Sequence, residues 1–200
     1  MNQPTLTTVT LRLALREERL LMRDWNVVAT IHDGGFRRAC RLLSLEGELS
    51  RTEFYNIVVM KVPDVDAFLG WLEKLWSESR SFAEVVAHVR PVRETFYFQS
   101  PEEFETKASE LALGLAERLA GKSFHVRIHR RGFKGRLSTK EEERSLADPI
   151  LARLSSSGTS ARVAFDDPDA VLAVDTVGDR AGMALWTRDD LRRYPFLGLG

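Results

Sequence analysis

The feature that most constrains the fold is the order of strand-like and helix-like segments between residues 25 and 98. A short apolar run at 25–31 precedes a turn, and residues 36–43 then carry apolar side chains at helical spacing, with Asp33 as a candidate cap. Two extended runs at 45–62, a helix after Asp64 and an extended run at 82–98 follow. This order is typical of ferredoxin-like units, so we expect an α+β domain over residues 25–98.

A second domain is expected over residues 99–200. Ser100, Pro101 and Glu103 supply an N-cap, a first-turn proline and a capping-box glutamate for a helix that Gly121 ends. A half-buried strand at 123–130, a helix that Pro149 kinks or divides, and three further strands complete the pattern. Residues 1–24 fit neither a strand nor a helix clearly, and we leave this N-terminal arm unassigned.

Composition limits the setting in which the chain works. The sequence has 200 residues, with 29 basic and 29 acidic side chains, so its formal net charge is zero. No apolar run approaches the length of about 20 residues that spans a bilayer, and the N-terminus lacks the features of a signal peptide. The single cysteine, Cys40, excludes an internal disulfide framework and fits a reducing compartment. We therefore expect a cytoplasmic protein with no membrane partner.

Basic side chains gather in one stretch, from Arg118 to Lys140, which contains no acidic residue. Arginine forks suit phosphate geometry, and two glycines in this stretch allow close approach of a ligand. Such a stretch also occurs as a solvated loop, but an aromatic residue among the charges favours RNA, whose bases stack on aromatic rings. The candidate RNA-binding residues are Arg127, Arg130, Arg131, Phe133, Lys134, Arg136 and Lys140, with Arg188, Arg192 and Arg193 as a second cluster. Arg130 and Arg131 follow the strand, so we expect their side chains to be largely solvated.

Catalytic and metal-binding signatures are missing. His125 and His129 lie on a predicted strand, where residues four apart are separated by roughly 13 Å, too far to share one ion. The sequence contains no Walker A, GxGxxG, GxSxG or HExxH motif. We expect no metal, no cofactor and no catalytic residues, and hence a chain that is not an enzyme.

Four motifs carry a resemblance to a known family. The strand SFHVRIHRRG ends in a basic pair, and Phe165-x-x-Pro168-Asp169 precedes the strand AVLAVDTV. Gly-Met-Ala-Leu follows at 182–185, and TRDDLRRY occupies 187–194. Over roughly 96–197 the chain resembles a THUMP domain, so we expect a THUMP α/β domain after the ferredoxin-like unit. The ending is similar to that of stand-alone THUMP proteins that serve as tRNA-binding adaptors for the tRNA cytidine acetyltransferase.

This resemblance implies a function. It implies that the chain binds tRNA near its acceptor end and presents it to a separate RNA-modifying enzyme, such as an acetyltransferase. Two alternatives stay open from the residues alone. One is a protein-interaction module whose arginine-rich loop binds an acidic protein partner, and the other is an enzyme without a recognised motif.

Overall fold

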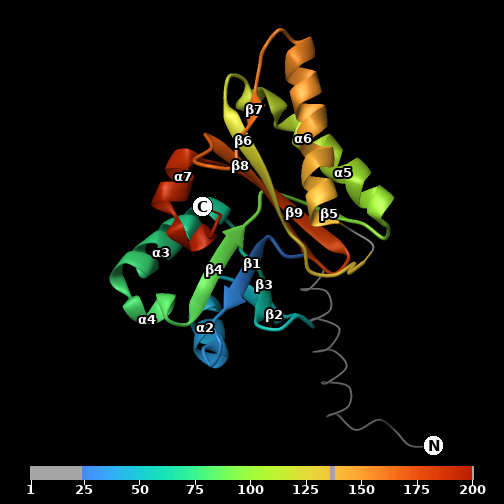
Figure 1. Cartoon of the computed structure of the whole chain (residues 1–200). Helices are drawn as coiled ribbons and strands as arrows, with labels where there is room; N and C mark the ends of the chain where they lie inside the picture. Colours follow the sequence, from blue (N-terminus) through green and yellow to red (C-terminus); the bar gives the residue numbers. More distant parts are fainter. Residues whose placement is uncertain (1–23, 136–137, 200) are drawn as a thin grey trace, which may run out of the picture. The chain divides into compact units, whose positions relative to one another are not determined.

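The computed structural model describes residues 24–135 and 138–199, and the chain divides into two units. The first unit ends at Arg90 and the second begins at Pro91, and each has its own sheet (Figure 1). The N-terminal arm, apart from Asp24, lies outside the described residues. Among the described helices, none is long and apolar enough to cross a membrane.

The first unit has a four-stranded sheet in the order β2-β3-β1-β4, with β3 antiparallel to both β1 and β2. Its elements are β1 (Val27–Ile31), α2 (Phe36–Leu43), β2 (Glu48–Arg51), β3 (Ile57–Lys61), α3 (Val65–Glu78), α4 (Arg80–Ala83) and β4 (Val86–Pro91). The predicted succession of strands and helices is therefore observed. The core is built from apolar side chains such as Trp25, Leu72 and Phe82, which are fully buried.

The two predicted helix caps of this unit differ in outcome. The Asp64 carboxylate accepts hydrogen bonds from the N–H groups of Asp66 and Ala67, which confirms it as the cap of α3. Asp33 does not cap α2, because the N-cap position is Gly35 and no side chain bonds to the free N–H groups there. The Asp33 carboxylate instead accepts a hydrogen bond of 2.6 Å from the Asn56 side chain.

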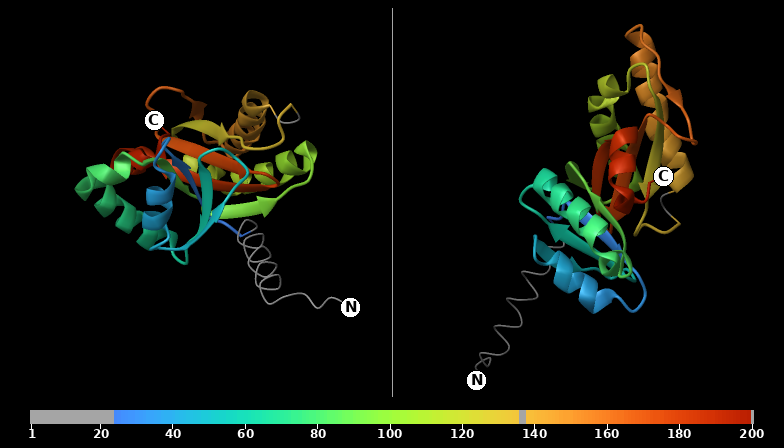
Figure 2. Two further views of the ribbon diagram at one scale, coloured as in Figure 1. Left: turned by 90° about the horizontal axis from the view of Figure 1, so that it is seen from below. Right: turned by 90° about the vertical axis from the view of Figure 1, so that its left-hand side faces the viewer.

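The second unit has a five-stranded sheet in the order β5-β9-β8-β6-β7. Its elements are β5 (Glu94–Tyr97), α5 (Pro101–Gly114), the 3-10 helix η1 (Ala116–Leu119), β6 (Ser123–His129), α6 (Thr139–Ser156), β7 (Arg162–Val163), β8 (Ala170–Val177), β9 (Arg180–Thr187), α7 (Arg188–Arg193) and the 3-10 helix η2 (Pro195–Leu197). Strand β6 runs parallel to β7 and β8, whereas β9 is antiparallel to β5 and β8. Helices α5 and α6 pack against each other over one core, as Figures 1 and 2 show.

The boundary between the units falls earlier than the sequence pattern suggests. The pattern grouped 82–98 with the first domain, but β4 and β5 belong to different sheets. Pro91 ends β4, and β5 pairs with β9 through residues such as Phe96 opposite Ala181. The structure therefore assigns 94–98 to the second unit, because proline interrupts one ladder and the next residues pair with another strand.

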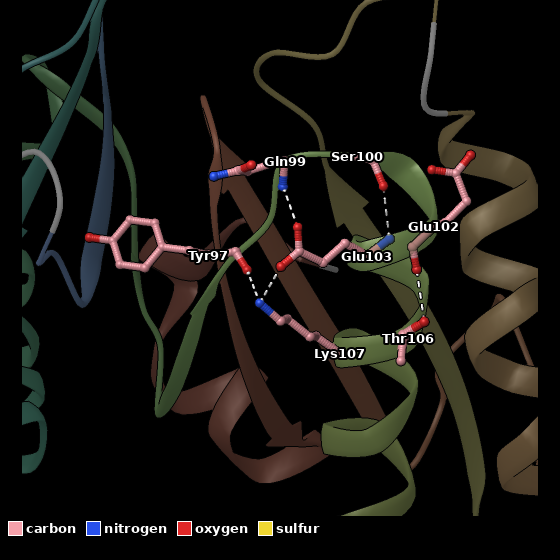
Figure 3. Close-up of polar contacts among 7 residues, drawn as sticks. All are labelled: Tyr97, Gln99, Ser100, Glu102, Glu103, Thr106 and Lys107. Carbon is pink, nitrogen blue, oxygen red and sulfur yellow. Dashed lines mark hydrogen bonds and ion pairs between the residues drawn. The ribbon is translucent and has the colours of Figure 1, made fainter.

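The start of α5 shows why the chain becomes helical at this point (Figure 3). The Ser100 hydroxyl accepts from the Glu103 N–H at 3.2 Å, and the Glu103 carboxylate accepts from the Gln99 N–H at 2.8 Å. Lys107 donates to that carboxylate and also to the Tyr97 carbonyl. The predicted N-terminus of this helix is confirmed, with the glutamate reaching one residue further back than in a standard capping box.

Two helix predictions in this unit need correction. The helix predicted up to Gly121 ends at Gly114, and a 3-10 turn follows because this turn places Ala116 and Leu119 together in the core. Helix α6 is neither divided nor ended at Pro149. Leu146 and Ile150 are fully buried on either side of the proline, so packing against the core holds the helix together there.

Candidate nucleic-acid interface

Strand β6 presents two chemically different faces. Phe124, Val126 and Ile128 are buried in the core, and the alternate positions, including His125 and Arg127, point to the other side of the sheet. Strand β7 pairs with β6 only at residues 123 and 124. Beyond that point the Glu143 carboxylate accepts the Ile128 N–H at 2.9 Å, so a side chain satisfies a backbone group of β6 where pairing with β7 has stopped.

A groove of about 1040 Å³ runs along this side of β6. Its walls are residues 125–129 of β6, the first half of α6, and Val163 and Phe165 at and just after the end of β7. Phe165 is 77% exposed, which makes it available for contact with a ligand. The groove thus combines a strand edge, a helix and an exposed aromatic ring, all within the second unit.

The aromatic part of the groove is a ring pair formed by His125 and Phe165. Their centroids lie 4.9 Å apart and their planes meet nearly edge to face, at 74°. Burial lowers the pKa of His125, and the nearby Arg127 lowers it further, against an opposing effect of Glu143. His125 is therefore largely neutral at pH 7, and it offers a ring for stacking rather than a cation for phosphate.

Cations flank this ring pair. Arg127 and Lys140 line the groove with exposed side chains, and both were predicted to contact RNA. Arg144 also lines the groove and is 85% exposed, with a long ion pair of 3.4 Å to Asp148. The sequence prediction missed Arg144 and Phe165 as RNA-binding residues, since Arg144 lies beyond the acid-free stretch and Phe165 was considered as part of the Phe165-x-x-Pro168-Asp169 motif. A useful signal was the lone phenylalanine beside the turn Asp166-Asp167-Pro168.

Arg131 is not solvated as predicted. Its guanidinium donates to the Asp175 carboxylate at 2.7 Å, and Asp175 is only 1% exposed. The Arg131 backbone is fixed as well, because its N–H donates to the Thr176 hydroxyl and its carbonyl accepts from the Gly178 N–H. The charge of Arg131 compensates a buried carboxylate of β8, and a buried carboxylate needs such a partner.

The neighbours of Arg131 are also held by the protein. Arg130 donates from its guanidinium to the Gly132 carbonyl at 2.6 Å and is half-buried rather than solvated. Phe133 was expected to stack on a base, but its ring packs on the buried Phe98 with centroids 4.8 Å apart. An apolar ring next to a core gains more from burial than from exposure, so Phe133 is not a free stacking surface.

The loop after β6 is held close to the turn between β8 and β9. Gly132 has φ of +104°, and a Cβ atom at this position would lie 3.2 Å from the backbone of Gly178. A side chain at residue 132 would therefore push the two turns apart and would also strain the backbone. The close contact with Gly178 is a structural reason for glycine at position 132, so a bound ligand is not needed to explain this residue.

The remaining predicted RNA-binding residues have different surroundings. Lys134 is exposed, and Arg136 lies outside the described residues. Arg188 pairs with Asp167 at 3.0 Å and with Asp169 at 3.1 Å, and the guanidinium of Arg193 lies over the Tyr194 ring at 5.1 Å. Arg192 is exposed. None of the three residues of the second cluster lines the groove.

Two carboxylates in the family-like motifs have structural roles. Asp169 accepts from the Ser123 N–H and hydroxyl at 2.8 and 2.7 Å, and these bonds are the main reason that the pKa of Asp169 lies below its usual value. This carboxylate joins the start of β6 to the start of β8, while Asp175 holds Arg131. Within residues 24–135 and 138–199, no three His, Cys, Asp or Glu side chains are arranged to hold a metal ion.

Comparison with known proteins identifies the fold. No protein-family model matches the sequence, and no curated protein matches it. Among solved structures, TrmN from Thermus thermophilus is similar with a TM-score of 0.55 and 20% identity, over 80% of this chain and 44% of that one. A 4-thiouridine synthetase in complex with RNA and bound ATP is similar with a TM-score of 0.50 and 14% identity, over 82% and 42% of the two chains.

A possible methylase from Clostridium difficile 630 matches with a TM-score of 0.53 and 15% identity, over 81% of this chain and 41% of that one. The chain therefore spans less than half the length of these three proteins. Their similarity over about 80% of this chain confirms the predicted mixed α/β fold class. The assignment of the first unit as ferredoxin-like rests on its own element and strand order.

The same comparison corrects one expectation. The chain was expected not to be an enzyme, but proteins of this fold include a 4-thiouridine synthetase and a possible methylase. The expectation was based on the absence of known catalytic sequence motifs. Such an absence excludes only the reaction mechanisms that require those motifs. We therefore do not conclude that this chain lacks enzymatic activity.

Proposed function

We propose that this chain binds tRNA through the groove beside β6 and holds it for modification. The observation that carries the proposal is the pair of rings formed by the half-buried His125 and the exposed Phe165, in a groove that Arg127, Lys140 and Arg144 flank. Stacking on an aromatic ring binds an unpaired base, while neighbouring cations bind the phosphates of the same strand. The groove therefore suits a single-stranded end of an RNA better than a duplex.

Two further observations support tRNA as the ligand. The motifs at 123–132 and 165–194 resemble those of THUMP domains, and one solved structure of this fold is a synthetase bound to RNA. We extend the proposal to the unpaired 3′ nucleotides of the acceptor end and to presentation of the tRNA to a modifying enzyme. The cytidine acetyltransferase of the resembling family is the candidate partner.

The test is Phe165→Ala, measured by titration with a tRNA transcript and with the same transcript lacking its unpaired 3′ nucleotides. Stacking contributes about 1–3 kcal/mol per base, so we expect affinity for the intact tRNA to fall roughly 5- to 150-fold. The trimmed transcript should bind the wild type and the variant equally. Phe165 is mostly exposed, so the stability of the protein should change by no more than about 0.5 kcal/mol.

Phe165→Tyr is the matched control, because it keeps a ring of nearly the same size and should keep the affinity. Equal affinity of the wild type and Phe165→Ala for the intact tRNA would show that the groove does not bind the tRNA. Binding that ribonuclease treatment leaves intact would favour the alternative of an acidic protein partner.

A further inference from the structure

Helix α2 of the first unit carries a second group of arginines, which the sequence pattern did not single out. Arg37, Arg38 and Arg41 are exposed, while Ala39 and Leu43 on the opposite side of the helix are buried. The helix contains no acidic residue. Within the described parts of the chain, none of these three guanidinium groups pairs with a carboxylate.

The end of β2 adds a fourth arginine beside this helix. The guanidinium of Arg51 lies over the ring of Phe36, the first residue of α2, at 5.0 Å from its centroid. This contact holds Arg51 next to the helix while its side chain stays exposed. Four arginines and no lysine thus gather where α2 begins and β2 ends.

An aromatic ring lies in the next turn of the chain. Tyr55 is 79% exposed, and its hydroxyl donates to the Asp33 carboxylate, which the Asn56 side chain also contacts. These hydrogen bonds hold the ring at the end of β1, just before α2. Its faces remain open to a ligand, and the Asp33 carboxylate already has two donors.

We infer that α2, Arg51 and Tyr55 form a second RNA-contacting surface, which binds the phosphate backbone through its arginines. This inference rests on the proposed function, because it assigns a further contact to the same RNA. Arginine is suited to phosphate by its planar fork, and no carboxylate within residues 24–135 and 138–199 pairs with Arg37, Arg38 or Arg41. RNA is favoured over an acidic protein because an exposed ring beside exposed arginines matches both the bases and the phosphates of a strand. A second contact on the same RNA also strengthens binding by raising the effective concentration.

The test compares the full chain with the double variant Arg37→Gln, Arg38→Gln. The probes are a tRNA transcript and a blunt RNA duplex, each titrated at several KCl concentrations. Loss of two phosphate contacts should lower the slope of log affinity against log salt by about 2 for both probes. The control is Lys74→Gln, Arg80→Gln, which removes the same charge from exposed positions elsewhere in the first unit and should leave the slope nearly unchanged.

The outcomes separate this inference from the proposed function. A wild type that binds neither RNA would refute both. If tRNA binds normally, and the slope of log affinity against log salt is the same for the double variant and the control, only the assignment of the α2 surface to RNA binding would be overturned. Poly-L-glutamate serves as a third probe, and loss of its binding with unchanged RNA binding would assign the surface to an acidic protein instead. Both arginines are exposed, so unchanged thermal melting should show that the double variant folds.

Discussion

Arg127 and Arg131 have the same side chain and lie four residues apart, yet the structure gives them different roles. Arg127 is exposed and lines the groove beside β6. Arg131 is 14% exposed and pairs with a buried carboxylate. The difference arises because β6 ends between them, and the chain after His129 continues beside the end of β8, where Arg131 bonds to Thr176 and Gly178. Position relative to a strand end, rather than charge, decides which arginine is available to an RNA.

We predict that Arg131→Ala destabilises the protein by about 3 kcal/mol, because it leaves Asp175 buried without this cation. Chemical denaturation of the purified protein measures the effect. Arg127→Ala is the matched control and should cost less than about 0.5 kcal/mol. Equal stability of the two variants would show that the ion pair contributes nothing. A double variant with Asp175→Asn should recover part of the loss.

Helices α5 and α6 meet at carboxyl groups as well as at apolar side chains. Glu142 in the first turn of α6 is only 4% exposed. Burial raises its pKa to about 7, and Glu105 of α5 adds to this through its charge and a hydrogen bond. Ser145 opposes the shift, since its hydroxyl lies 3.4 Å from the Glu142 carboxylate. The packing of these helices therefore favours a protonated Glu142.

This raised pKa makes stability depend on pH. The folded protein holds the proton up to about pH 7, whereas the unfolded chain releases it near its ordinary value of 4.5. The stabilising contribution is therefore complete below pH 4.5 and is lost as the pH rises through 7. Glu142→Gln should raise the free energy of unfolding at pH 8 by on the order of 1–3 kcal/mol and change it little at pH 4.5.

Urea denaturation of Glu142→Gln at both pH values checks this prediction. Glu141→Gln, at the exposed neighbouring position, is the control and should show a much smaller pH dependence, because the charge of Glu141 is only the weakest of the causes that raise the pKa of Glu142. A constant difference between Glu142→Gln and the wild type across this range would show that the carboxyl is not protonated in the folded protein.

At the scale of the whole molecule, the boundary at Pro91 predicts which fragment folds alone. Residues 91–200 contain all five strands of the second sheet, including β5, which begins at Glu94. We expect this fragment to melt cooperatively, since its core is made by its own helices and strands. A fragment from residue 99 lacks β5 and exposes the edge of β9, and it should melt at a lower temperature.

Calorimetry of the two fragments measures the difference. The longer fragment should still bind tRNA, more weakly than the full chain if the surface on α2 contributes. Equal melting temperatures would show that β5 adds nothing to the second unit. Affinity equal to that of the full chain would restrict RNA contact to the second unit.

Much of the fold could be predicted from the sequence because its signals are local. The Asp64 cap and the Ser100–Glu103 start depend on residues within one turn, and both were found. The strand partner of β5 and the ion pair of Arg131 with Asp175 join residues more than 40 positions apart, and no local pattern encodes them. For the same reason the sequence indicated where cations gather, but not that Phe165 would meet His125.

The close approach of Gly132 to Gly178 has a practical consequence for labelling the protein. A dye, tag or inserted residue between 130 and 135 would separate two turns that touch through their backbones. Its signal would then reflect a structural change that the label itself causes. The turn at Gly158 is different, because a Cβ there would meet no atom within 4 Å and its neighbours are exposed. That turn lines no part of the groove, so a fluorophore at Ser157 could follow RNA binding without competing with it.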